Sequence, residues 1–210
     1  MERVRSLAQV KNIMGKHFIG PIELARIADV LGIIPPKSFP EIPFGLNELQ
    51  ELKRDYILLL GSSHMKNGEE LSLRTLIKHF GINPAEFEPC FYNQDWYLNE
   101  SFINNILSPK WFLIRKNIIT ITRGKIPEDN LLNYDLPSAL ECAYSFFACW
   151  FHLKKCLWKH DYVWCKDFDS NGDRIYVARY YDPIKKNKNG FSIHRHLQIK
   201  QSFGCINVNT

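Results

Sequence analysis

The chain has 210 residues, of which 45% are hydrophobic and 13% aromatic, and its formal net charge is +5. This composition excludes an intrinsically disordered chain, which needs low hydrophobicity and high net charge. No run approaches the roughly 20 apolar residues of a membrane-spanning helix, and the basic N-terminus lacks the continuous apolar core of a secretory signal. We therefore expect a cytoplasmic protein with no membrane partner.

The six cysteines form no C-x-x-C pair. Three of them recur at every seventh residue within one apolar segment, which favours buried thiols in a reducing compartment over a disulfide framework or a zinc knuckle.

The first half of the chain predicts helices. Apolar stripes with suitable caps indicate helices over 2–14, 21–31, 46–60 and 73–80, and Asn99 is a candidate cap for a short helix that ends at Leu107. Four prolines between residues 33 and 45 exclude a helix there and predict an extended connector. Residues 1–107 are thus predicted to form a mainly helical lobe.

The second half changes character. The β-branched and aromatic stretch 111–122 predicts a strand. Ser138 and Glu141 have the spacing of a capping box, and they open a helix over 139–158 that is apolar nearly all round. A helix of that kind is typically buried, so we expect the domain to fold around it.

An antiparallel β-meander is predicted to follow this helix. Strand-like runs over 161–169 and 174–182 flank Asn171-Gly172, a strong hairpin signal. A third strand is expected over 191–200, and residues 203–208 are a candidate fourth. The fold class is therefore α+β, a single domain over residues 1–210 that comprises the helical lobe and an α+β part over 110–210 with a C-terminal basic sheet.

Two pairs of residues in this meander carry ligand chemistry. His194 and His196 are two residues apart on one predicted strand, and Asp167 and Asp169 have the same spacing on another, so each pair points to one face. Two imidazoles and two carboxylates form a ligand set for zinc, manganese or iron, or a general acid and base. The alternative is that these polar residues occupy the solvent face of a half-buried strand. We predict no cofactor, with a divalent transition metal as the alternative.

The positive charge points to a binding surface. Residues 151–210 hold eleven Lys or Arg and five Asp or Glu, a net +6, which leaves −1 for residues 1–150. Cationic groups neutralise phosphates, and aromatic rings stack on bases. The candidate binding residues are the basic and tyrosine side chains of the predicted sheet and its loop: Arg174, Tyr176, Tyr180, Lys185, Lys186, Lys188, Arg195 and Lys200.

We therefore expect a non-catalytic binding protein whose basic, Tyr- and Arg-containing sheet contacts nucleic acid or an acidic protein surface. One alternative is a metal-dependent hydrolase or nuclease that uses the His and Asp pairs. Another is a structural subunit of a larger assembly. The sequence has no phosphate-binding G-x-x-x-x-G-K-[ST] or G-x-G-x-x-G motif and no G-x-S-x-G, which disfavours the common nucleotide enzymes and serine hydrolases. The oligomeric state stays open.

Overall fold

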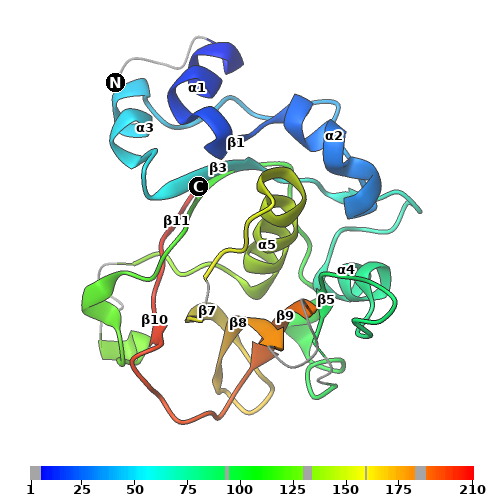
Figure 1. Ribbon diagram of the computed structural model, residues 1–210, viewed down its shortest axis with the longest axis vertical. Helices are drawn as coiled ribbons and strands as arrows, with labels where there is room; N and C mark the ends of the chain where they lie inside the picture. The colour runs from blue at the N-terminus through cyan, green and yellow to red at the C-terminus, as the bar shows by residue number, and fades with distance from the viewer. Residues whose placement is uncertain (1–5, 93–94, 130–133, 159, 183–187) are drawn as a thin grey trace.

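The computed structural model describes residues 6–92, 95–129, 134–158, 160–182 and 188–210, which form an α+β fold. Figure 1 shows its central feature, the helix α5 (Ala139–Leu153), which lies between two β-sheets. The part of the chain that is described contains no helix that is both long and apolar enough to cross a bilayer.

The first sheet has the strand order β1 (Phe18–Ile19), β3 (Tyr56–Leu60), β6 (Trp111–Arg115) and β11 (Val208–Asn209). Strand β3 is buried along its whole length, and its residues alternate between two cores. Ile57 and Leu59 belong to the large core that includes α5, whereas Leu58 and Leu60 belong to a second core beneath the N-terminal helices.

The helix predicted over 46–60 is therefore wrong in its second half. Helix α3 (Leu46–Leu52) ends at Leu52, and the chain continues into strand β3. A strand that is buried on both faces is a continuous apolar run, and periodicity alone does not distinguish such a run from a buried helix.

The other helices of the first half are α1 (Leu7–Met14), α2 (Pro21–Leu31) and α4 (Leu73–Phe80). The bounds of α2 and α4 are those predicted, because Pro21 and Ser72 mark their starts and glycines mark their ends. The predicted helix over 2–14 is seen from residue 7, and residues 1–5 lie outside the described part. Strands β2 (Ile33–Ile34) and β4 (His64–Met65) form a separate two-stranded ladder.

Helix α5 begins with the predicted capping box. The Ser138 hydroxyl accepts from the Glu141 backbone N–H at 3.1 Å, and the Glu141 carboxylate accepts from the Ser138 N–H at 2.7 Å. Residues 139–149 are buried, as expected for a helix that is apolar on all sides. The helix ends at Leu153, five residues before the predicted end, because Lys154 adopts a left-handed conformation.

The second sheet has the order β10 (Phe203–Gly204), β7 (Tyr162–Phe168), β8 (Arg174–Asp182), β9 (Lys188–His194) and β5 (Cys90–Phe91). Strands β7, β8 and β9 are antiparallel neighbours, and β10 and β5 add parallel edges. One face packs on α5. The other face carries a small aromatic core of Trp164, Tyr176 and Phe203.

Two predicted strands are shorter than expected. The strand expected over 111–122 ends at Arg115, and the turn η3 (Thr120–Thr122) follows. The strand expected over 191–200 ends at His194, and the next residues turn away from the sheet. The remaining short 3-10 turns are η1 (Gly15–His17), η2 (Ser101–Asn104) and η4 (Pro127–Asp129).

Candidate contact surface on the C-terminal sheet

The hairpin between β7 and β8 is held by Asp169. Its Oδ1 atom accepts hydrogen bonds from the backbone N–H groups of Asn171 and Asp173, both at 2.9 Å. Gly172 occupies a position with a φ of 84°, which favours glycine. The Asn-Gly hairpin predicted from the sequence is therefore present, with an aspartate side chain as its organising acceptor.

The second oxygen of Asp169 is held by Arg195. The Arg195 Nη1 atom lies 2.6 Å from Asp169 Oδ2, and the guanidinium also lies over the Trp96 ring at 4.5 Å. Burial opposes ionisation of Asp169, but the bonds from Arg195 and the two backbone N–H groups outweigh it, so the pKa of this carboxyl lies below its usual value. Both oxygens of this carboxylate are therefore satisfied inside the protein.

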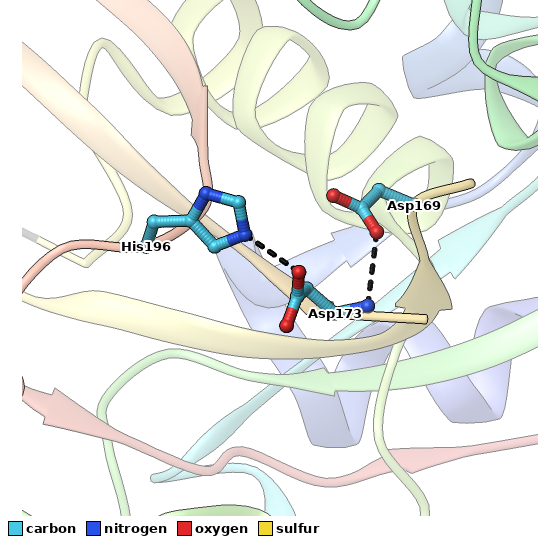
Figure 2. A group of neighbouring side chains, drawn as sticks. All are labelled: Asp169, Asp173 and His196. Carbon is cyan, nitrogen blue, oxygen red and sulfur yellow. Dashed lines mark hydrogen bonds and ion pairs between the residues drawn. The ribbon is translucent and has the colours of Figure 1, made fainter. Parts of the chain in front are cut away.

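His196 lies next to the same turn (Figure 2). Its Nε2 atom is 2.6 Å from Asp173 Oδ2, and His196 has a positive φ of 61° in the turn after β9. One ligand atom from each of Asp169, Asp173 and His196 lies within 4.8 Å of the other two. Carboxylates and imidazoles are suitable ligands for zinc or manganese. A cation at this point would also lie beside the Arg195 guanidinium, which opposes its binding.

Asp167 lies apart from this group. Its Oδ2 atom accepts from the Ala139 N–H at 2.7 Å, at the start of α5, and its Oδ1 atom accepts from Asn105 Nδ2 at 3.3 Å. Burial raises the pKa of Asp167. A register shift in β7 between Trp164 and Phe168 breaks the regular alternation on which the predicted Asp pair depended.

His194 also has other partners. Its Nε2 atom is 2.9 Å from Ser192 Oγ, and its ring is stacked on Tyr176 with a centroid distance of 6.0 Å. Burial lowers the pKa of His194 to about 4. Because β9 ends at His194, the two-residue alternation does not extend to His196, and the two imidazoles contact different groups. Of the four predicted ligands the structure brings together Asp169 and His196, and it adds Asp173, which is not one of those four.

The predicted binding residues differ in their accessibility. Tyr176 is only 1% exposed, and its hydroxyl accepts from the Leu197 N–H at 2.6 Å, so its ring is not available for stacking. Arg174 lies over the Phe168 ring and forms a 2.7 Å ion pair with Glu128. Lys200 is exposed. Lys185 and Lys186 lie outside the described residues, as do the side chains of Tyr180 and Lys188.

A pocket of about 270 Å³ opens beside these residues. Its floor includes the buried Trp164 and Tyr176, and its rim carries four exposed apolar side chains from three segments: Ile126, Phe168, Leu197 and Ile199. These four side chains are between 37% and 44% exposed.

The sequence reasoning missed this pocket. The strand expected over 191–200 would have kept Leu197 and Ile199 in the sheet, whereas β9 ends at His194. No periodic signal links the three segments, which meet only in the folded chain.

The comparisons with known proteins do not assign a function. No family model, no curated protein and no solved structure matches this chain. Any functional conclusion therefore depends on the geometry of the site.

Proposed function

We propose that this chain is a non-catalytic binding protein whose contact surface is the pocket at the end of the C-terminal sheet. The observation that carries this proposal is the group of four exposed apolar side chains around one hollow. Isolated exposed apolar residues are normal, but several gathered at a concave site are typical of a protein-binding surface. The proposed partner is an acidic protein segment that inserts an apolar side chain.

The pocket lies at the small end of the range for ligand sites, which suits the insertion of a single side chain. Drug-sized ligands and cofactors occupy pockets of roughly 300–1,000 Å³. At about 270 Å³ and open to solvent, this pocket is suited to one large side chain.

The charges around the pocket support an acidic partner. Glu128 is paired with Arg174, and Asp173 is paired with His196, so both pocket carboxylates already have partners within the protein. Lys125 and Lys200 are exposed, and each is the sequence neighbour of a rim residue, Ile126 and Ile199 respectively. Carboxylates on either side of an inserted apolar residue would meet these two ammonium groups.

Fluorescence anisotropy with labelled peptides tests this proposal. The probes are short peptides in which a central Leu, Phe or Trp is flanked by Asp and Glu. We expect saturable binding to the native protein that weakens at least about tenfold in Leu197→Ser, since losing a leucine side chain that the bound peptide would cover costs more than about 1.4 kcal/mol.

The matched control is Ile22→Ser. Ile22 is 61% exposed on α2, outside the pocket, so the same kind of change there should leave peptide affinity unaltered. Absence of binding to the native protein, or an equal loss in both variants, would overturn the proposal.

The alternative function is metal-dependent hydrolysis or nuclease action at the group of Asp169, Asp173 and His196. The proximity of three ligand atoms supports it. The ion pair between Asp169 and Arg195 argues against it, because the most buried of the three ligands is already neutralised.

A further inference from the structure

A second charged surface lies at one end of the first sheet. It is centred on Lys116, whose Nζ atom lies 3.5 Å from both ring nitrogens of His17. Lys16 and Lys155 add two more cationic groups close enough to act on both. We call the surface around Lys16, His17, Lys116 and Lys155 the basic surface.

The topology of the sheet explains why these groups meet. Strand β1 is parallel to β3, and β6 is antiparallel to β3, so the start of β1, the start of β3 and the end of β6 lie at one end of the sheet. Two bonds hold this end together: the Lys116 N–H donates to the Asp55 carbonyl at 2.8 Å, and His17 Nδ1 lies 3.1 Å from the Lys53 carbonyl. The residues that follow α5 reach the same end.

Each of the segments that meet here carries a pair of basic residues. The pairs occupy positions 16–17, 53–54, 115–116 and 154–155, and with Asp55 they contain seven Lys or Arg and one Asp. Together these residues carry a formal charge of +6. Asp55 lies 3.9 Å from Arg115 and offsets only one of these charges.

The cations affect one another. Burial lowers the pKa of His17, and the nearby Lys116, Lys16 and Lys155 lower it further. Burial also lowers the pKa of Lys116, and Lys16 and Lys155 add to this effect while Asp55 opposes it. Like charges held this close repel, and a bound anion removes that repulsion.

The chemistry of the surface identifies the class of anion. Lys16, Arg54, Lys154 and Lys155 are exposed, whereas none of the large hydrophobic side chains exposed in the described part of the chain belongs to these four segments. A protein interface needs apolar anchors at its centre, which this surface lacks. A group of Lys and Arg without such anchors suits a phosphate backbone.

We infer that this surface binds the phosphodiester backbone of a nucleic acid without sequence selectivity. The inference is independent of the proposed peptide pocket, which uses other residues. Tyr56, the aromatic ring beneath Arg115, is buried and cannot stack on bases, so duplexes should bind as well as single strands.

The test is fluorescence anisotropy with labelled duplex and single-stranded oligonucleotides. If the four exposed cations each neutralise one phosphate, duplex affinity should fall roughly 100-fold between about 50 and 200 mM salt. The double variant Lys16→Glu/Lys155→Glu should weaken binding at low salt at least about tenfold and reduce the salt slope by about 2, because two phosphate contacts are lost. Both side chains are exposed, and thermal unfolding verifies that the variant is folded.

The matched control is Lys66→Glu/Lys78→Glu. It makes the same change in net charge at two exposed ion pairs, with Asp29 and Glu69, that contribute little to stability. This control should retain oligonucleotide affinity within about threefold, since long-range charge effects are screened.

Three results would overturn the inference. These are no binding of either oligonucleotide at low salt, equal losses in the two double variants, and competition by poly-glutamate as effective per charge as competition by DNA. The last result would assign the surface to an acidic protein.

Discussion

His194 provides a quantitative test of the structure of the second sheet. The ring is stacked on Tyr176, meets Tyr162 edge-on with a centroid distance of 5.6 Å, and has Ser192 Oγ 2.9 Å from Nε2. The Ser192 hydroxyl donates to the Ala178 carbonyl, so its oxygen accepts from His194 and the proton lies on Nε2. Burial deprives the protonated ring of hydration, which lowers the pKa of His194 to about 4.

Proton linkage gives the sign and size of the pH dependence that His194 imposes on the free energy of unfolding. The unfolded ring takes up its proton near the ordinary 6.5, whereas the folded ring resists protonation down to about 4. The stabilisation that comes from burying the neutral ring is therefore fully present above pH 6.5. It is lost as the pH falls from 6.5 towards 4. Between about pH 7.5 and pH 5 the free energy of unfolding should fall by up to about 2 kcal/mol through this residue.

Urea unfolding of the native protein and of His194→Gln at a series of pH values isolates this effect. Burial also lowers the pKa values of His17 and His152, so both proteins share the pH dependence that comes from those rings. We expect the stability of the native protein to decline more steeply than that of the variant, by up to about 2 kcal/mol over this range. Parallel pH profiles, or an NMR titration of His194 near 6.5, would refute the buried stack.

Three further predictions concern an ion pair, a helix capping box and metal binding. Arg195→Ala should lower the free energy of unfolding by about 2 kcal/mol in urea unfolding, because it leaves the buried Asp169 carboxylate without its charged donor. A change below about 0.5 kcal/mol would show that the Arg195–Asp169 pair does not stabilise the fold. Glu141→Ala should cost about 1 to 2 kcal/mol in the same assay through loss of the bond to Ser138 at the start of α5, whereas an unchanged stability would show that the capping box contributes nothing. Zinc or manganese added to chelator-treated protein should leave the midpoint of thermal unfolding unchanged, both in the native protein and in His196→Ala. A metal-dependent rise of that midpoint in the native protein that is absent in His196→Ala would instead support the hydrolase alternative.

The elements that the sequence predicted well have their signals within a few residues. Pro21 and Gly32 bound α2, and Ser138 with Glu141 starts α5, because caps satisfy backbone groups that every helix end leaves open. The strand 56–60 was mistaken for helix because its burial on both faces comes from tertiary packing, which removes the two-residue alternation.

The two surfaces were harder to predict because each is made from distant segments. The pocket combines Ile126, Phe168 and the turn after β9, and its apolar rim is indistinguishable from core in the sequence. The basic surface takes five of its seven Lys or Arg from residues 1–150, whose net charge is −1, so an average over that region conceals it. Charge counts along a chain do not show which charges the fold brings together.

The most direct test of the proposed contact surface is methyl NMR of isotope-labelled protein titrated with the acidic, apolar peptides. We predict that the methyl signals of Ile126, Leu197 and Ile199 shift together with peptide concentration, while those of Ile22 and Ile82, which are exposed elsewhere, stay in place. Shifts that spread equally over all exposed methyl groups, or that leave the three pocket residues unmoved, would contradict a binding function at the C-terminal sheet.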